Sequence, residues 1–424
     1  MCRSRLSSET LITRPLPVTI SAYRLVEIWL PYGHSEIPVR VPEERLVDIL
    51  KPDSTNPLPN PAVRATELLK SNEPFLGKAH QATRVCIVLG SCGGEQMTTE
   101  LTKAVLEFVT TSQDSTTILC TEESVEPYIT GVGGSRVVRH TAKSEATDCA
   151  ALKDGFVPQL NSEFVKADLR VLIGELRPHP FLGYAGLCDL VFPYLASESS
   201  MLAHRAERPV SGPTDLHKER VEISKSFDSI FALGLGLDAE LRVQSVVFDT
   251  MGNSLASLEP IVTEAYSKQV TKRADILVMS AGGAPFDSTL DRSIESFPAG
   301  LEALKRDGAL IVAAECGEGH GGRQFYEWSS EHKEPRYLES RLRHHFSYDG
   351  FKASFLGRTL QTHRVYLVST IPDHYVENVF SMRPAPTVNA ALQSAQRAHG
   401  ADSTISIIPN ACRVTPRPLE PAKQ

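Results

Sequence analysis

The residues with the clearest chemical potential stand directly after apolar, strand-like runs. His179 lies in the segment RPHPFLGYAGLCD (177–189), two residues after Arg177 and between prolines that restrict the backbone. An imidazole exchanges protons near neutral pH, because its ordinary pKa is about 6.5, and a guanidinium offers paired donors to a carboxylate. The segment therefore predicts a catalytic His179 beside a substrate-binding Arg177. A buried histidine that only ends the strand would leave the same pattern.

Three further glycine-rich loops follow apolar runs, at 90–96, 280–292 and 315–328. In open α/β sheets, ligands bind beyond the carboxyl ends of the strands, and glycine-rich strand ends leave backbone N–H groups free to face an anion. Gly93, Gly94, Gly282 and Gly283 are therefore candidates for binding a ligand. His320, in GEGHGG, fits a substrate-binding base and an exposed imidazole in a tight turn equally well.

The runs that precede these loops belong to a repeating strand–helix pattern. Apolar stretches rich in Val and Ile, such as 83–90 and 274–283, alternate with helical stretches such as 98–111. This alternation predicts an α/β fold of two domains, each with a mostly parallel sheet flanked by helices. The expected units are an N-terminal α/β domain with a small β-rich cap, a C-terminal α/β domain and a flexible tail, at 1–268 (cap 20–60), 269–410 and 411–424.

Composition narrows the class of partner. The chain has 424 residues, a formal net charge of −7 and an isoelectric point near 6.0, so we expect no nucleic-acid surface. No run approaches the roughly 18 apolar residues that span a bilayer, and no CxxC pair occurs among the eight cysteines. These features predict a cytoplasmic protein without a membrane partner, which binds either a small molecule or no ligand.

Four segments resemble a known family. They are WLPYGHSEIPVRVP (29–42), IGELRPHPFLGYAGLCDLVFP (173–193), ADILVMSAGGAPFDSTL (274–290) and LIVAAECGEGHG (310–321). In order and spacing they are similar to the motifs of the lactate racemase family over nearly the whole chain. The resemblance implies a two-domain α/β protein with its site between the domains. It also implies an isomerase that interconverts 2-hydroxyacid stereoisomers with a nickel-pincer nucleotide.

Matched residue by residue, the resemblance is uneven. His179 corresponds to one acid/base histidine of the family, in a context kept through Phe181, Gly183 and Tyr184. Gly186 and the loop glycines correspond to cofactor-binding positions. The lysine that tethers the cofactor is expected ten residues after the histidine, where this chain has Asp189.

Other family positions also differ. His204 lies one residue short of the expected nickel ligand, and a cofactor-binding Gln and Lys pair reads Arg292 and Glu295. The segment expected to carry the second acid/base histidine reads ILCTEESVEPY and contains none. A carboxylate at position 189 cannot form the lysine's covalent link.

Three functions remain open on these residues. The first is a hydroxyacid isomerase that holds the cofactor without a tether or attaches it through Cys188. The second is a different enzyme on the same scaffold, with His179 as a base and Arg177, Arg292 or Arg323 holding an anion. The third is a non-catalytic binding protein that has lost the nickel-pincer site.

Overall fold

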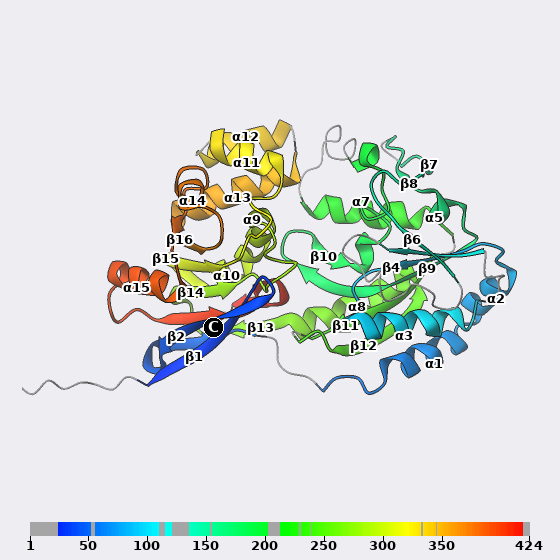
Figure 1. Ribbon diagram of the computed structural model, residues 1–424, viewed down its shortest axis with the longest axis horizontal. Coiled ribbons are helices and arrows are strands. Elements are labelled where there is room, and N and C mark those ends of the chain that lie inside the picture. The colour runs from blue at the N-terminus through cyan, green and yellow to red at the C-terminus, as the bar shows by residue number, and fades with distance from the viewer. Residues whose placement is uncertain are drawn as a thin grey trace, which may run out of the picture.

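The computed structural model describes residues 24–51, 56–109, 115–120, 135–152, 155–201, 213–228, 230–238, 240–331, 334–344 and 346–418. These residues form two lobes, each built on a mostly parallel sheet with helices on both faces (Figure 1). The predicted fold class is confirmed. Within the described ranges, no helix has both the length and the apolar character that a membrane crossing requires.

The sheet of the first lobe has the strand order β12-β11-β9-β4-β5-β6, with β10 paired to the end of β9. The strands are β4 (Val85–Leu89), β5 (Thr116–Cys120), β6 (Arg136–Arg139), β9 (Leu169–His179), β10 (Gly183–Gly186), β11 (Ile230–Leu237) and β12 (Val243–Thr250). All neighbours are parallel except the pairs β11–β12 and β9–β10. The central strands are buried on both faces, which explains their nearly continuous apolar sequences.

Alternate side chains of these strands pack against different helices. Val85, Ile87 and Leu89 of β4 face one core, whereas Cys86 and Val88 face the other. The first core is covered by α1 (Pro61–Ser71), α2 (Glu73–Gln81) and α3 (Glu95–Leu106), and the second by α5 (Ser162–Lys166), α7 (Pro213–Lys225) and α8 (Met251–Tyr266). A short antiparallel pair, β7 (Ala146–Asp148) and β8 (Gln159–Asn161), lies outside the main sheet.

The sheet of the second lobe has the order β17-β16-β15-β14-β18-β3, and every neighbouring pair is parallel. Its strands are β3 (Leu46–Ile49), β14 (Ala274–Ser280), β15 (Leu304–Ala313), β16 (Arg364–Val368), β17 (Arg383–Pro384) and β18 (Ile405–Ile408). The flanking helices are α9 (Leu290–Ser293), α10 (Phe297–Ala303), α11 (Arg323–Glu331), α12 (Pro335–His344), α13 (Tyr348–Thr362), α14 (Asp373–Asn378) and α15 (Val388–His399). Short 3₁₀ turns lie at η1 (Glu43–Arg45), η4 (Leu187–Asp189), η5 (Ile294–Ser296) and η6 (Ala411–Arg413).

The N-terminal strands belong with the second lobe and not with the first. Strands β1 (Leu25–Tyr32) and β2 (Ser35–Pro42) form an antiparallel ribbon that lies beside the second lobe in Figure 1. Leu30, Val39 and Val41 of the ribbon are buried in one core with strands β14, β15 and β18. The expected β-rich cap therefore exists, but its packing differs from its predicted place in the N-terminal domain, because its apolar face finds its partners some 230 residues further along.

The tail is also ordered as far as the structure describes it. The prediction of a flexible segment from residue 411 is wrong for residues 411–418, where η6 is followed by β19 (Thr415–Pro418), which pairs in parallel with β13 (Ser267–Val270). Arg413 is only 3% exposed. Backbone pairing and one buried arginine hold this segment in place. Neither feature can be predicted from the low apolar content of the tail.

Candidate functional site

The two sheets present their topological switch points to each other. In the first sheet the order of connection reverses between β4 and β9, and in the second it reverses between β14 and β18. Ligands of open α/β sheets lie beyond the carboxyl ends of the strands at such points. Gly90 and Ser91 follow β4, Gly282 follows β14, and Asn410 follows β18, and all four line one cavity between the lobes.

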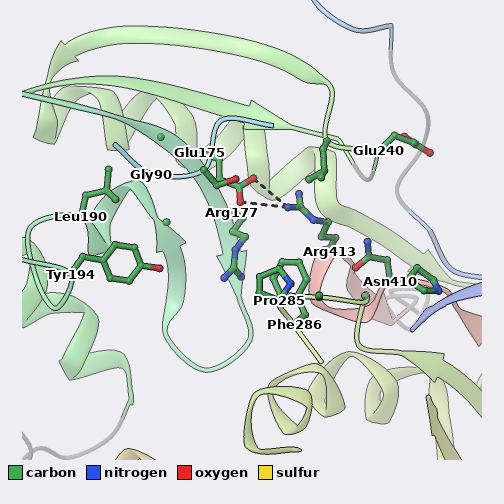
Figure 2. Close-up of a pocket in the computed structure, with 17 residues that line it drawn as sticks. Gly90, Glu175, Arg177, Leu190, Tyr194, Glu240, Pro285, Phe286, Asn410 and Arg413 are labelled. Atoms are coloured by element: carbon green, nitrogen blue, oxygen red, sulfur yellow. Dashed lines mark hydrogen bonds and ion pairs between the residues drawn. The ribbon is translucent and has the colours of Figure 1, made fainter. Parts of the chain in front are cut away.

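This cavity, which we call the cleft, has a volume of about 440 Å³. Its walls also contain Glu175, Arg177, Gly186, Leu190, Tyr194, Glu240, Leu241, Pro285, Phe286 and Arg413 (Figure 2). A second cavity of about 360 Å³ adjoins it and shares Arg177, Tyr194, Pro285 and Phe286. We call this second cavity the side pocket. Both volumes lie in the range of roughly 300–1,000 Å³ that is usual for small-molecule sites.

Arg177 stands where the two cavities meet. Its guanidinium carbon lies 5.0 Å from the centre of the Phe286 ring, and that of Arg413 lies 5.5 Å from the same ring. Arg413 is neutralised by Glu175, at 3.4 Å, as the dashed lines of Figure 2 show. Within the described residues, no carboxylate forms an ion pair with Arg177, so its charge faces the cleft without a partner of opposite sign.

His179 points across the interface between the lobes. The backbone N–H groups of Phe181 and Leu182 both donate to its Nδ1, each at 3.2 Å. Nδ1 therefore holds the lone pair, and Nε2 carries the proton and donates to Glu295 at 3.1 Å. The ring is only 5% exposed and lines neither cavity, whereas Glu295 lines the side pocket.

Glu295 is the centre of a buried polar network. The Tyr348 hydroxyl donates to it at 3.0 Å, and the Lys352 ammonium lies 3.7 Å away. Burial raises the pKa of Glu295, but the contacts with His179, Lys352 and Tyr348 outweigh it and lower the pKa to about 2. Lys352 in turn donates to Asp291 at 2.8 Å. The side pocket therefore presents an ionised carboxylate at neutral pH.

Asp189 faces away from both cavities. Arg220 on α7 donates to one of its carboxylate oxygens at 2.5 Å, and the Gly186 N–H donates to the other at 2.9 Å. The pair is nearly buried, with side chains 12% and 10% exposed. The carboxylate completes the turn that begins at Gly186 and neutralises an arginine of its own lobe. The cofactor contact of Asp189 therefore stays a prediction without support from this geometry.

The neighbouring Cys188 gives no alternative point of attachment. Its side chain is fully buried, and burial together with the charge of Asp189 raises the pKa of the thiol well above its usual value. A thiol needs access and thiolate character to react, so the structure contradicts attachment through Cys188.

The predicted ligand-binding glycines divide into two groups. Gly186 and Gly282 line the cleft. Gly93, Gly94, Gly183 and Gly283 line none of the described cavities, and the backbone needs them for another reason, since all four have positive φ angles between 71° and 133°. Tyr184 also lies elsewhere, because its hydroxyl is 2.8 Å from that of Thr263 on α8.

The other predicted residues have separate outcomes. Arg292 lines the side pocket, which leaves its proposed ligand contact open. His320 does not line the cleft or the side pocket; it belongs to a third cavity in the second lobe. Arg323 is exposed and pairs with Glu327 at 2.6 Å, and His204 lies outside the described residues.

Sequence reasoning missed several residues of the site. Glu175, Phe286, Lys352 and Arg413 were not predicted. Phe286 lies in a loop that was singled out, so position after a strand was an available signal for it. Glu175 lies inside β9, two residues before Arg177, and gave no such signal. Lys352 is on a helix and gave no such signal.

Two α/β lobes that oppose their switch points across a cleft define a class of two-lobed α/β protein with a ligand site between the lobes. Models for the N-terminal and C-terminal domains of lactate racemase match residues 32–211 and 269–415. The chain belongs to the lactate racemase family, as its motifs predict.

Relatives and solved structures agree with this assignment. A lactate racemase from Thermoanaerobacterium thermosaccharolyticum is 30% identical over 296 residues, 66% of this chain and 69% of that protein. One from Lactiplantibacillus plantarum is 23% identical over 297 residues, with the same shares of the two chains. The structure of the T. thermosaccharolyticum lactate racemase apoprotein aligns with a TM-score of 0.76 and 25% identity, and covers 92% of this chain and all of that one. A Thermotoga maritima protein shares the fold, with a TM-score of 0.60 and 13% identity, over 86% of this chain and all of that one.

Proposed function

We propose that this chain is a racemase or epimerase of small 2-hydroxyacids, and that the carboxylate of the substrate binds Arg177 in the cleft. The observation that carries the proposal is the position of this guanidinium. It faces a cavity at the switch points of both sheets and has no carboxylate partner in the described parts of the chain. A planar guanidinium and a carboxylate form paired, charge-assisted hydrogen bonds, so a bound acid would supply the missing charge.

The side pocket is suited to the hydroxyl group of the same substrate. Glu295 lines this pocket and stays ionised at neutral pH, so it accepts a hydrogen bond from a hydroxyl. His179 holds Glu295 from the first lobe, whereas Tyr348 and Lys352 hold it from the second. We assign Glu295 to the contact with the hydroxyl and His179 to the positioning of Glu295, because the Nε2–H group of His179 donates to this carboxylate.

The nickel-pincer nucleotide does not fit the residues found at the expected attachment point. Both oxygens of Asp189 are occupied by Arg220 and Gly186, and the Cys188 thiol is buried. In the parts of the chain that the structure describes, no three His, Cys, Asp or Glu side chains gather closely enough to hold a metal ion. No step of the proposal therefore passes through the nickel-pincer nucleotide. The experiment that tests the proposal includes a measurement of the metal content of the protein.

A chiral assay tests the proposal directly. Single enantiomers of a panel of 2-hydroxyacids are incubated with the purified protein, and both enantiomers are quantified by chiral chromatography, with the nickel content of each preparation measured in parallel. We expect the opposite stereoisomer to form, and Arg177→Gln to raise KM by about tenfold or more, because a hydrogen bond to a charged group contributes about 1.5–3 kcal/mol. Arg323→Gln, at an exposed arginine outside the cavities, is the matched control.

A second candidate is a binding protein, or a different enzyme, for small organic anions. The Asp189–Arg220 pair favours it, because this pair occupies the position at which the family attaches its cofactor. A thermal-shift screen distinguishes the two, since a ligand that binds only the native state raises the melting temperature. Stabilisation by acids that depends on Arg177, without inversion of any acid in the panel, would favour this second function over the first.

A further inference from the structure

A third cavity lies within the second lobe and shares no lining residue with the cleft or the side pocket. It has a volume of about 360 Å³ and lies beyond the carboxyl ends of β15 and β16. Four rings form its walls, those of His320, Tyr326, Tyr375 and Phe380. We call it the aromatic pocket. Gly317, Gly319 and His320 of the GEGHGG segment line it, and none of these three residues lines the cleft.

The rings are arranged as the sides of a box. Tyr326 is inclined by 63° to Tyr375 and by 75° to Phe380, with ring centres 6.5 and 6.4 Å apart. The His320 ring is inclined by only 33° to that of Tyr326, with centres 4.7 Å apart, so these two rings form one side. A flat ligand stacks best between parallel faces, whereas steeply inclined faces surround a compact group from several sides. The geometry therefore favours a rounded ligand over a planar one.

The charges around the pocket favour a cation. Its lining contains no lysine, arginine or carboxylate, so the aromatic faces, which carry negative electrostatic potential, dominate the interior. Three exposed acidic residues stand next to lining residues in the sequence: Glu318 between Gly317 and Gly319, and Asp373 and Glu377 on either side of Tyr375. An aromatic interior with an acidic rim attracts an organic cation.

The lack of anionic acceptors in the pocket favours a cation that carries no N–H group. The Thr370 hydroxyl donates to the carbonyl of Glu315 at 2.8 Å, and the lining contains no carboxylate. Nδ1 of His320, which is shielded from solvent and has no partner, can accept at most one hydrogen bond. A primary ammonium would lose its hydration there without enough acceptors to replace the water. A quaternary ammonium has no N–H group, and this cost does not arise.

The loop beneath the pocket is held in an uncommon conformation. Cys316, which begins the lining, has a φ angle of +54°, in the left-handed region that favours glycine. Its N–H donates to the carbonyl of Asp287 at 2.8 Å, and its carbonyl accepts the N–H of Gly319 at 2.9 Å. Strained residues cluster at ligand sites, and this one shapes the floor of the aromatic pocket.

We propose that the aromatic pocket binds the quaternary ammonium group of a small organic cation. Cation–π contacts with Tyr326 and Tyr375 supply the attraction, and the acidic rim adds a long-range term. The site is separate from the cleft and does not depend on the function proposed for it.

The test compares choline with its neutral carbon isostere, 3,3-dimethylbutan-1-ol, on the full chain. Saturation-transfer NMR follows the methyl singlet of each probe during a titration. We expect choline to bind at least about tenfold more tightly than the isostere, since they differ in charge and not in shape. Equal binding of the two would show a merely apolar pocket and overturn the proposal, and so would the absence of choline binding.

Three variants locate the binding. Tyr326→Leu and Tyr375→Leu should weaken choline binding about fivefold or more, whereas Tyr375→Phe, which keeps the ring face, should change it little. Tyr337→Leu, at a tyrosine of α12 that is 52% exposed and outside the pocket, is the control. If Tyr326→Leu does not fold, Tyr375→Leu decides alone, because Tyr375 is already 39% exposed. If the Tyr375→Leu variant binds choline as tightly as the wild type does, the cation binds elsewhere and the proposal is wrong.

Discussion

The two ends of the segment 177–189 carry ionised groups that face opposite ways. At the first end, Arg177 opens onto the cleft and His179 reaches Glu295 of the other lobe. At the second end, Asp189 turns into its own lobe and pairs with Arg220. The first end presents a guanidinium to the cleft, which is the basis of the proposed substrate site, whereas the charge at the second end is balanced within its own lobe.

The two ends also differ in what their structure requires. The first end requires only a strand end and a neighbouring lobe. The second end is a turn in which the Gly186 N–H and the Arg220 guanidinium together satisfy one carboxylate. A carboxylate placed there is structurally useful, and this turn accounts for Asp189 without any ligand.

Removing the carboxylate at the second end should have the largest effect. Asp189→Ala leaves the Arg220 guanidinium nearly buried and unpaired, and the loss of one partner of such a pair typically costs about 3–5 kcal/mol. We expect a loss of stability of this size, measured by urea denaturation monitored by circular dichroism.

A double variant separates the charge from the packing. Asp189→Ala combined with Arg220→Met removes both charges and should recover most of the lost stability, because a neutral, similarly long side chain leaves no unpaired ion. If the double variant were as unstable as Asp189→Ala alone, the turn and not the ion pair would be the source of the effect.

Changing Glu295, the carboxylate that His179 contacts at the first end, should have a smaller effect on stability, and this effect should depend on pH. The folded pKa of Glu295 is about 2, below its ordinary value of 4.5. The ionised carboxylate therefore adds stability above about pH 4.5, and this contribution is lost as the pH falls through the folded pKa. Glu295→Gln keeps an acceptor for His179 but does not titrate. We expect the variant to be less stable than the wild type by about 1–3 kcal/mol at pH 7.

The acid side of the stability profile provides the check. The difference between Glu295→Gln and the wild type should narrow steadily between pH 5 and pH 3, in denaturation midpoints measured at constant ionic strength. A constant difference across this range would contradict the electrostatic account of Glu295.

The sequence predicted the residues whose position depends on strand ends. Arg177 and His179 follow the carboxyl end of a run that the alternation of strands and helices already marks as buried. The sequence did not predict the direction in which a side chain points across the interface between the lobes. The contact between His179 and Glu295 joins residues 116 positions apart, and no local pattern encodes such a pairing.

The errors have a common physical origin. The segment 411–418 was expected to be flexible because it has few apolar residues, but β19 is held by backbone pairing with β13 and Arg413 by Glu175. The β-rich cap was assigned to the domain nearest in sequence, although its apolar face packs on the second lobe. In both cases long-range contacts determine the placement, and composition and sequence proximity carry little information about them.

A smaller effect is expected inside the first lobe, at Tyr184. Its hydroxyl is 2.8 Å from that of Thr263 and lies away from the cavities. Tyr184→Phe removes one hydrogen bond and should cost about 1 kcal/mol in stability, with no change in ligand binding measured by thermal shift. A clear change in ligand affinity would mean that the side chain of Tyr184 reaches the ligand after all.

The smallest effect concerns the rim of the cleft. Leu241 lines the cleft, is 42% exposed and has a φ angle of +63°, a conformation that costs an L-residue about 1–2 kcal/mol. Leu241→Gly and Leu241→Ala both remove the side chain, but only glycine relieves the backbone. Since glycine gives back about 0.5–1 kcal/mol through the entropy of the unfolded chain, we expect the glycine variant to be more stable than the alanine variant by up to about 1 kcal/mol. Equal denaturation midpoints of the two variants would show that the backbone at Leu241 is not strained.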